Sequence, residues 1–206
     1  MNKAAFLDRD GVINRKSASE DEYITRWEEM QILPGVSEGI RLLNQAGFLV
    51  IVISNQRCIA KGLLSTAELD VIHRRLCSTL LARRARIDAI YYCPHEENPP
   101  CGCRKPEPGM LFAAAQEHAI NLQSSWMIGD STKDVEAGKR AGCKTARIVR
   151  VPGTVDSEAD LVARSLREAA HQILRIDKPY LPARKSHQGS LLRATKLTSR
   201  SGSSHQ

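Results

Sequence analysis

Short apolar runs alternate along the chain with segments in which apolar residues recur every three or four positions. The clearest run is residues 48–53, six consecutive apolar side chains rich in β-branched types, as expected of a parallel strand covered on both faces. A helical spacing precedes it over residues 36–46, and Gly47 ends that segment. Further strands are expected at residues 4–7, 87–92, 126–128 and 145–149, and further helices are expected to begin at Ser65 or Thr66, at Pro108 and near Val135, with a last one over residues 156–176.

Strands that alternate with helices predict an α/β fold with a doubly wound, mostly parallel, Rossmann-like sheet. Ligands of such sheets bind beyond the carboxyl ends of the strands, so polar residues that follow the apolar runs are the candidates for function. Residues 15–29 are polar and are expected to form a loop or lid. We expect one domain over residues 1–177 and a disordered tail over 178–206, where Ser, Arg, Lys and Gly dominate without periodicity.

The formal net charge of +7 is unevenly distributed. Residues 178–206 contain six of the 30 Lys and Arg residues and none of the 23 Asp and Glu residues, so the rest of the chain is almost neutral. Because the excess positive charge belongs to the expected tail, a nucleic-acid partner is not favoured. The longest apolar run is too short to cross a bilayer and the first residues lack a signal-peptide pattern, so a cytoplasmic location is expected. We also expect a monomer.

Two carboxylates follow the first apolar run, in the sequence Asp8-Arg9-Asp10-Gly11. An extended backbone through Asp10 would send Asp8 and Asp10 to one side and Arg9 to the other. One carboxylate would then attack phosphorus, and the other would pass a proton to or from the leaving oxygen. Asp-x-Asp is also common in ordinary loops, but its place at a strand end favours a catalytic pair.

Two later segments offer groups that bind phosphate. Ser54 and Asn55 follow the strand at 48–53 and can present a hydroxyl, an amide and backbone N–H groups, although both residues also favour turns. Gln56 is a further candidate for binding substrate. Arg104 and Lys105 supply two adjacent cations, which would grip and neutralise a phosphate or else form a solvated basic pair.

A third carboxylate, Asp130, follows the strand at 126–128. Together with Asp8 and the backbone carbonyl of Asp10 it offers the oxygen ligands that Mg²⁺ prefers. Ser131 is a candidate for binding substrate. Asp134 lies at the start of a helix, where it would orient neighbouring groups or favour the helix N-terminus.

Four potential metal ligands lie within eleven residues: Cys93, His95, Cys101 and Cys103. This set suits tetrahedral Zn²⁺ and leaves no open position, so the site would be structural and would hold the loop that carries Arg104. Reduced, unliganded cysteines are the alternative. No special role is assigned to Cys58, Cys77, Cys143, His73, His118 or His171, which are expected to pack in the interior or lie on helices.

In combination, four motifs resemble the haloacid dehalogenase superfamily of phosphatases: Asp8-Arg9-Asp10-Gly11, Ser54-Asn55-Gln56, Cys-x-His with Cys-x-Cys-Arg-Lys-Pro, and Gly129-Asp130. They resemble more narrowly its zinc-loop branch, which contains D-glycero-D-manno-heptose-1,7-bisphosphate 7-phosphatase and histidinol-phosphate phosphatase. The likeness extends over about residues 4–151. Residues 11–14 and the Tyr-Tyr pair before Cys93 are more similar to the heptose enzymes.

The resemblance implies a Mg²⁺-dependent phosphatase that acts through an aspartyl-phosphate and has no large cap domain. It implies that Asp8 is the nucleophile and that Asp10 is the general acid that later activates water. Ser54 and Lys105 would stabilise the phosphoryl group, and Arg104 would help to recognise a small phosphorylated sugar. The heptose enzymes of this branch remove the C7 phosphate on the way to nucleotide-activated heptose for lipopolysaccharide or other surface glycans.

The segments that border the sugar in relatives are atypical in this chain. Arg57 and Cys58 replace the small residue and the glycine that usually follow Asn-Gln, and Glu22-Tyr23 replaces a frequent Gly-Tyr. Histidinol phosphate or another small phosphomonoester therefore stays open as the substrate. A hypothesis from another class is a zinc-stabilised protein that binds a polyanion through its basic tail. A polynucleotide 3′-phosphatase is disfavoured because the basic charge lies away from the motifs.

Overall fold

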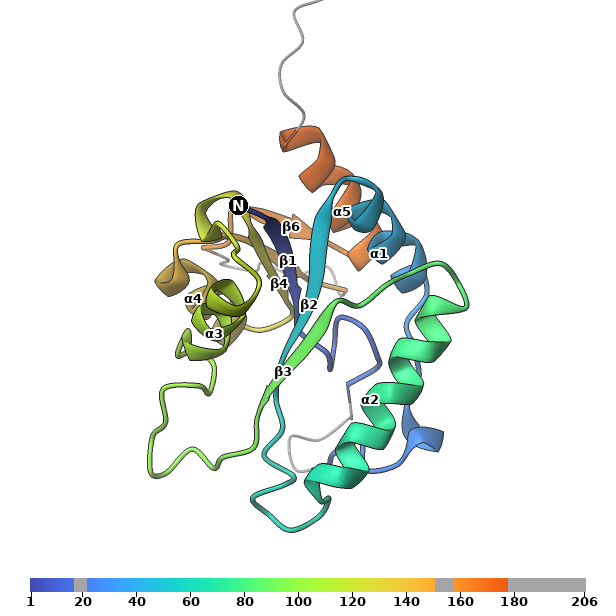
Figure 1. The fold of residues 1–206 in the computed structure, drawn as a ribbon, viewed down its shortest axis with the longest axis vertical. Coiled ribbons are helices and arrows are strands. Elements are labelled where there is room, and N and C mark those ends of the chain that lie inside the picture. The colour runs from blue at the N-terminus through green and yellow to red at the C-terminus, as the bar shows by residue number, and fades with distance from the viewer. Residues whose placement is uncertain (17–21, 151–157, 178–206) are drawn as a thin grey trace, which may run out of the picture.

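The computed structural model describes residues 1–16, 22–150 and 158–177. Within them, parallel strands form a single sheet in the order β3-β2-β1-β4-β5-β6, with helices on both faces (Figure 1). The predicted doubly wound α/β architecture is confirmed, and these residues include no large cap domain. The strands are β1 (Lys3–Leu7), β2 (Phe48–Asn55), β3 (Ala89–Cys93), β4 (Trp126–Gly129), β5 (Lys144–Ile148) and β6 (Leu161–Ala163). The helices are α1 (Val36–Gln45), α2 (Thr66–Leu81), α3 (Gly109–Glu117), α4 (Thr132–Ala141) and α5 (Leu166–Ile176), with short 3-10 helices at Trp27–Glu29 and Leu122–Ser124.

The register of the central strands aligns their carboxyl ends. Leu7, the last residue of β1, pairs with Val52 of β2 on one side and with Ile128 of β4 on the other. Asn55 at the end of β2 pairs with Cys93 at the end of β3. The segments that follow β1, β2, β3 and β4 therefore leave the sheet at one edge, as parallel strands require.

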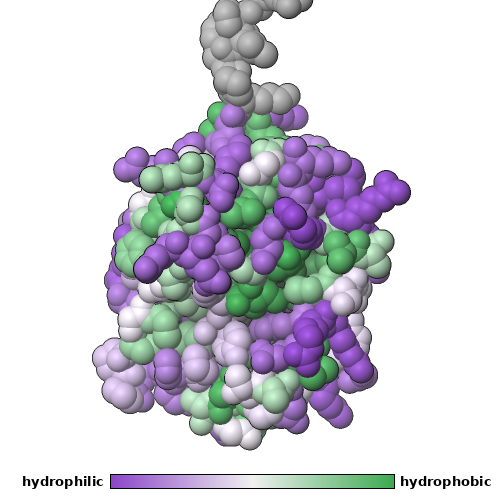
Figure 2. Space-filling view, in the orientation of Figure 1, coloured by the Kyte–Doolittle hydropathy of each residue, from purple (hydrophilic) through white to green (hydrophobic). Residues whose placement is uncertain are grey.

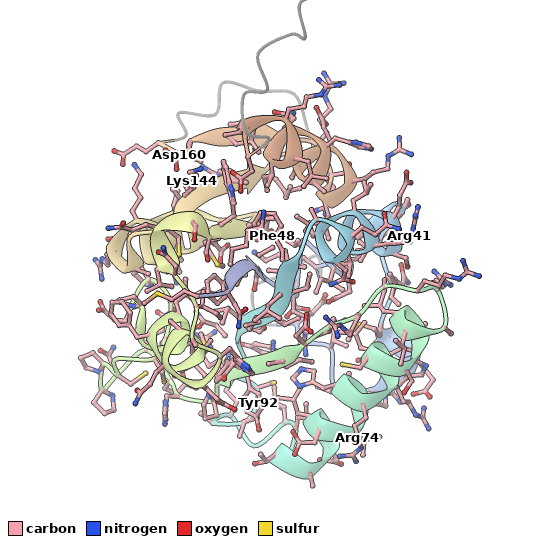
Figure 3. All side chains as sticks on the ribbon, turned by 45° about the horizontal axis from the view of Figure 1, so that its top comes forward. Arg41, Phe48, Arg74, Tyr92, Lys144 and Asp160 are labelled. Carbon is pink, nitrogen blue, oxygen red and sulfur yellow. The ribbon has the colours of Figure 1, made fainter. Side chains whose placement is uncertain are left out.

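The central strands β1, β2 and β4 are buried on both faces because helices cover each side of the sheet. Along β1, Ala5 and Leu7 pack with the cluster that includes α1 and α5, whereas Ala4 and Phe6 pack with α3 and α4. This alternation is the period of two that a strand imposes. Side chains fill both layers, with Phe48 inside the molecule and Arg74 on its periphery (Figure 3).

Local signals in the sequence account for several helix ends. Ser65 caps α2: its hydroxyl accepts from the backbone N–H of Glu68, whose carboxylate accepts in return from the Ser65 backbone. Pro108 comes directly before α3, as predicted. The basic residues Arg83, Arg84 and Arg86 lie beyond the end of α2. Arg84 adopts a left-handed backbone conformation with a φ of 59°.

The prediction of one helix over residues 156–176 is wrong in its first half. Leu161–Ala163 forms β6, in which Val162 is exposed between two buried neighbours. Such alternation is typical of a strand, but three residues are too few to outweigh the apolar spacing of the following helix. Helix α5 begins only after Ser165, whose hydroxyl accepts from the backbone N–H of Glu168. Residues 156 and 157 lie outside the described residues.

The expected tail over 178–206 also lies outside the described residues, as does the part of the expected loop at 17–21. Within the described ranges, no helix combines the length and the apolar character needed to cross a membrane. On the face shown in Figure 2, hydrophilic side chains predominate and hydrophobic ones lie between them.

Candidate active site

Asp8 is fixed at the carboxyl edge of the sheet by the strand that precedes it. Its backbone N–H continues the β1 ladder and donates to the carbonyl of Ile128 at 2.9 Å. The residue is only 9% exposed. Burial raises the pKa of its carboxyl to about 7, even though the ammonium of Lys105 opposes that shift. The Asp8 carboxylate therefore depends on neighbouring cations to stay ionised.

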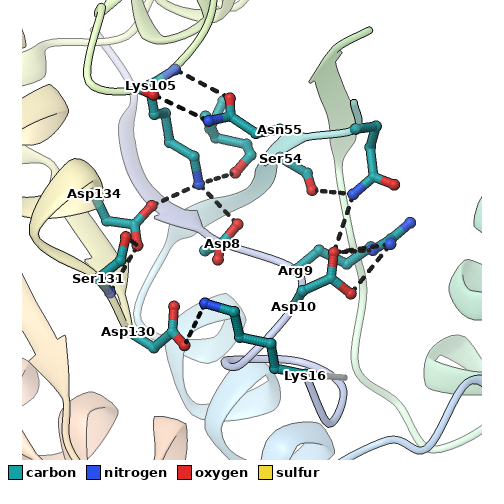
Figure 4. Close-up of polar contacts among 12 residues, drawn as sticks. Asp8, Arg9, Asp10, Lys16, Ser54, Asn55, Lys105, Asp130, Ser131 and Asp134 are labelled. Carbon is teal, nitrogen blue, oxygen red and sulfur yellow. Dashed lines mark hydrogen bonds and ion pairs between the residues drawn. The ribbon is translucent and has the colours of Figure 1, made fainter. Parts of the chain in front are cut away.

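Lys105 is the cation that connects the carboxylates of the site (Figure 4). Its Nζ donates to Asp8 Oδ1 at 2.7 Å and to the Ile53 carbonyl at 2.8 Å, and it lies 2.6 Å from Asp134 Oδ1. Burial alone would lower the pKa of Lys105, but the two carboxylates outweigh burial and raise the pKa. The side chain is thus a buried, charged ammonium directed at the nucleophile candidate.

The residues after β2 hold this arrangement in place. Asn55 uses both atoms of its side-chain amide on the backbone of Lys105: Nδ2 donates to the carbonyl, and Oδ1 accepts from the N–H, each at 3.0 Å. The Nε2 group of Gln56 donates to Ser54 Oγ at 2.7 Å and to Asp10 Oδ2 at 3.0 Å. Ser54 and Asn55 line the cavity, whereas Gln56 lies behind them, 2% exposed.

Asp10 sits in a cradle of donors. Arg9 Nη2 lies 2.8 and 3.1 Å from the two Asp10 oxygens, Arg9 Nε adds a contact at 3.2 Å, and Asn14 Nδ2 donates at 2.8 Å. Burial alone would raise the pKa of Asp10, but these donors and Gln56 outweigh burial and lower it. The backbone is not extended through Asp10, because β1 ends at Leu7 and the chain turns from Arg9, whose carbonyl accepts from the N–H of Ile13.

A turn after Asp10 is the physical reason for that departure. Gly11 has a φ of +97°, a conformation that glycine adopts without strain. Its backbone N–H donates to the carbonyl of Asn14 at 2.8 Å, and the carbonyl of Arg9 accepts from the N–H of Ile13 at 2.8 Å. The chain therefore reverses directly after the second carboxylate, and Val12 and Ile13 of the turn pack into the core on the side of α1 and α5.

A divalent cation suits the carboxylates at the other side of Asp8. Oxygen atoms of Asp8, Asp130 and Asp134 lie within 4.8 Å of one another. Lys105 and, at 3.8 Å from Asp130, Lys16 lie beside these carboxylates. Burial raises the pKa of Asp130, although the charges of Lys16, Lys105 and Arg150 oppose that shift. Clustered carboxylate oxygens are the ligands that Mg²⁺ prefers.

Two glycines make room for these carboxylates. A Cβ atom on Gly11 would lie 2.2 Å from Asp130 Oδ2, and a Cβ atom on Gly129 would lie 2.1 Å from the Cβ of Asp134. Any larger residue at either position would push a carboxylate out of the cluster. The close approach of backbone and carboxylates is thus part of the site.

Ser131 directly precedes α4, and its polar groups hydrogen-bond to a carboxylate of the same cluster. Its hydroxyl donates to Asp134 Oδ2 at 2.6 Å and its backbone N–H donates to the same oxygen at 3.0 Å. Asp134 therefore joins the helix N-terminus to Lys105, which agrees with the expectation that it orients its neighbours. Ser131 also lines the cavity.

The cavity over Asp8 has a volume of about 340 Å³, and charged side chains form its rim. Glu97 accepts from Arg104 at 3.2 Å and from Lys133 at 3.0 Å. Across the cavity, Arg57 Nε donates to the hydroxyl of Tyr23 at 2.9 Å. Sequence reasoning did not identify Glu97, Lys133 or Lys16 as site residues, because the sequence does not show which charged side chains of these segments reach the cavity.

The predicted zinc ligands converge at the end of β3. Cys93 Sγ lies 3.6 Å from Cys101 Sγ and 3.3 Å from Cys103 Sγ, and His95 Nδ1 lies 3.5 and 3.3 Å from the sulfurs of Cys93 and Cys103. A tetrahedral Zn²⁺ with Zn–S bonds of about 2.3 Å places sulfurs about 3.8 Å apart. The observed spacing fits such an ion with little adjustment.

Known proteins resemble this chain over most of its length. The family model described as "HAD-hyrolase-like" matches residues 102–169. The D-glycero-beta-D-manno-heptose-1,7-bisphosphate 7-phosphatase of Pseudomonas aeruginosa is 37% identical over 175 residues, which cover 82% of this chain and 97% of that protein. The enzyme of the same name from Escherichia coli K12 is 35% identical over 187 residues, with 85% and 96% covered.

A solved structure gives the same result. The D,D-heptose 1,7-bisphosphate phosphatase of B. bronchiseptica, complexed with magnesium and phosphate, superimposes with a TM-score of 0.75 at 33% sequence identity. The match covers 84% of this chain and 99% of that one.

Proposed function

Because the chain belongs to the D-glycero-beta-D-manno-heptose-1,7-bisphosphate 7-phosphatase family of haloacid dehalogenase-like hydrolases, we propose that it removes the C7 phosphate of D-glycero-D-manno-heptose 1,7-bisphosphate. The chain is a phosphoric monoester hydrolase. The observation that carries the substrate proposal is the match to enzymes of this name along nearly their whole length. These matches do not favour histidinol phosphate, the alternative substrate.

Asp8 is the nucleophile in this proposal. One of its carboxylate oxygens attacks phosphorus, the bond from phosphorus to the C7 oxygen breaks, and the electron pair of that bond passes to the leaving oxygen. Lys105 supports this role, because its ammonium lies 2.7 Å from Asp8 and balances charge as a phosphoryl group arrives. Ser54 lines the same end of the cavity and offers its hydroxyl to a phosphoryl oxygen.

Asp10 moves the protons. It gives a proton to the C7 oxygen as that oxygen leaves, and then accepts a proton from the water that attacks the aspartyl-phosphate, which releases inorganic phosphate and restores Asp8. In the free enzyme the donors around Asp10 favour its ionised form. The negative charge of the bound phosphate opposes that effect and raises the pKa of Asp10, so the residue takes up its proton with the substrate.

Asp8, Asp130 and the backbone carbonyl of Asp10 are the residues that would hold Mg²⁺. When bound, this ion supplies positive charge to the oxygens of the transferring group. The clustering of carboxylate oxygens around Asp8 and Asp130 supports the assignment. Asp134 is not a ligand in this proposal. Its carboxylate holds Lys105 and the N-terminus of α4 in position.

Cys93, His95, Cys101 and Cys103 would hold a structural Zn²⁺. Four protein ligands leave no position for substrate, so the ion serves to hold one loop conformation. That loop leads directly into Arg104, which lines the cavity and is proposed to contact the sugar phosphate.

The test is phosphate release by the purified protein with Mg²⁺. The substrates are the β and α anomers of heptose 1,7-bisphosphate, histidinol phosphate and an oligonucleotide with a 3′-phosphate, and Asp8→Asn is the control. We expect turnover of the heptose substrate, with the β anomer preferred, and loss of at least 10³-fold in the mutant, since no carboxylate remains to attack. Preference for another substrate would refute the heptose proposal. Turnover that survives Asp8→Asn would refute the mechanism.

A further inference from the structure

Arg9 is a guanidinium buried in the interior, with 1% of the residue exposed. Its Nε and Nη2 atoms are occupied by Asp10. Its remaining nitrogen, Nη1, lies 3.3 Å from Nε2 of His73, which belongs to α2 and is 6% exposed. Arginine can only donate, so Nε2 of His73 is the acceptor and the ring carries its proton on Nδ1. Burial, aided by the charge of Arg9, lowers the pKa of His73 to about 3, in agreement with a neutral ring.

The two contacts fix the guanidinium at both ends. His73 is itself held against the ring of Tyr92, with a centroid distance of 5.7 Å. A planar guanidinium bonded at one end to Asp10 and at the other to a fixed acceptor cannot reorient by rotation about its side-chain single bonds without losing a buried hydrogen bond. The helix α2 therefore sets the orientation of Arg9, and Arg9 sets the orientation of Asp10.

We propose that His73 is a positioning residue for proton transfer, which acts through Arg9 to hold the Asp10 carboxyl where it protonates the leaving oxygen. His73 lies outside the set of residues that line the cavity, so it reaches the reaction only through Arg9. The inference rests on the proposed function, because it takes Asp10 as the proton donor.

Positioning of an acid has a signature that general loosening of the fold does not have. A sugar alkoxide leaves only if it is protonated, whereas p-nitrophenolate leaves at neutral pH without a proton. The value of kcat/KM includes steps only as far as departure of the leaving group. A misplaced acid therefore lowers kcat/KM for an alkyl phosphate more than for p-nitrophenyl phosphate.

The experiment compares the wild-type enzyme with His73→Leu and His73→Gln on the heptose bisphosphate and on p-nitrophenyl phosphate, with Mg²⁺ present. We expect His73→Leu to lower kcat/KM for the sugar phosphate by about 10- to 100-fold and for p-nitrophenyl phosphate by less than about 3-fold. His73→Gln places an amide oxygen near Arg9 Nη1 and should recover most of the loss. For the sugar phosphate, KM should change little and kcat should fall.

A matched variant separates positioning from packing. Ile72→Ala removes the neighbouring buried side chain of α2, which belongs to an apolar cluster. It should lower the melting temperature while leaving the ratio of the two kcat/KM values unchanged. Equal losses of His73→Leu on both substrates, or no loss on either, would overturn the proposal. If wild-type enzyme does not hydrolyse the heptose substrate, the proposed function fails, and the comparison is made with the alkyl phosphate that it does hydrolyse.

Discussion

Gly11 matters for the side chain that it lacks. It lies in the turn after Asp10, where its backbone closely approaches the carboxylate of Asp130. The close approach explains why the chain reverses directly after Asp10 and does not continue as a strand. In the proposed site, a residue that takes no part in bond making thus decides whether the Mg²⁺ ligands Asp8 and Asp130 can approach one cation.

Replacing Gly11 with alanine should impair the metal site. The new Cβ would lie 2.2 Å from Asp130 Oδ2, so the carboxylate must move, and the φ of +97° is strained for alanine. We expect the Mg²⁺ concentration for half-maximal activity to rise at least 10-fold, and Mg²⁺ binding measured by calorimetry to weaken in parallel.

Gly142→Ala is the control for backbone strain. Gly142 has a φ of +80°, and a Cβ there would meet nothing within 4 Å. This variant should lose about 1 kcal/mol of unfolding free energy and keep the wild-type dependence on Mg²⁺. Equal effects of the two substitutions on Mg²⁺ affinity would show that strain, and not contact with Asp130, is responsible.

At the level of elements, contacts at two places hold the loop between β3 and α3 in position. The cysteine and histidine cluster holds its middle, and the Asn55 amide holds the backbone of Lys105 from the end of β2. Lys105 therefore reaches Asp8 from a segment that has no regular secondary structure. Rigidity in this loop comes from side chains, since a backbone ladder is absent from it.

Loss of zinc should consequently affect the reaction more than the fold. Cys101→Ser removes one ligand at the start of the segment that carries Arg104 and Lys105. We expect the bound zinc measured by mass spectrometry to fall from about one equivalent to near zero, and kcat/KM to fall at least 10-fold. Cys77→Ser, on α2 and outside the cluster, should retain zinc and activity. Full activity without zinc would contradict the role of the loop.

Sequence patterns sufficed for elements whose signals are local. The run at 48–53, the Ser65 to Glu68 capping pair and the Cys and His spacing each depend on neighbours in the chain, and each has its expected structure. The short edge strand β6 was missed because three residues carry little periodicity. Its start is fixed by a contact distant in sequence, in which Thr145 N–H and Oγ1 donate to Asp160 Oδ2 at 2.7 and 2.8 Å.

The same division holds within the site. Asp8, Lys105 and Asp130 were predicted to gather because all follow strands of one parallel sheet. The link between Arg9 and His73 spans 64 residues, and no motif announces which helical histidine will face a buried guanidinium. The sequence also does not show that both polar atoms of the Asn55 side-chain amide bind the backbone of Lys105. An asparagine at this position could equally well bind a substrate.

At the scale of the whole molecule, a neutral histidine in the core makes the fold sensitive to acid. His73 has an ordinary pKa of 6.5 when the chain is unfolded and about 3 in the folded protein, because it is buried and lies beside Arg9. Below pH 6.5 the unfolded chain therefore binds a proton that the folded chain does not. This contribution to stability is complete above pH 6.5 and is lost progressively as the pH falls toward 3.

At pH 5 we expect the low pKa of folded His73 to reduce the free energy of unfolding by about 2 kcal/mol, because each pH unit below 6.5 reduces it by about 1.4 kcal/mol. The measurement is urea unfolding of wild-type protein and His73→Gln at pH 7.5 and pH 5. Glutamine does not titrate, so the variant should lose less stability on acidification by about that amount. Parallel losses in the two proteins would mean that the folded His73 takes up its proton as easily as the unfolded one.

Residues from two parts of the structure line the cavity. The sheet edge supplies Asp8 and Ser54, whereas Tyr23, Arg57 and Glu97 reach it from loops that leave the sheet. Substitutions in these loops can therefore change which phosphorylated sugar fits the cavity, while the residues at the sheet edge stay the same. Arg57, at a position where relatives usually have a smaller residue, lies in one of these loops and lines the cavity.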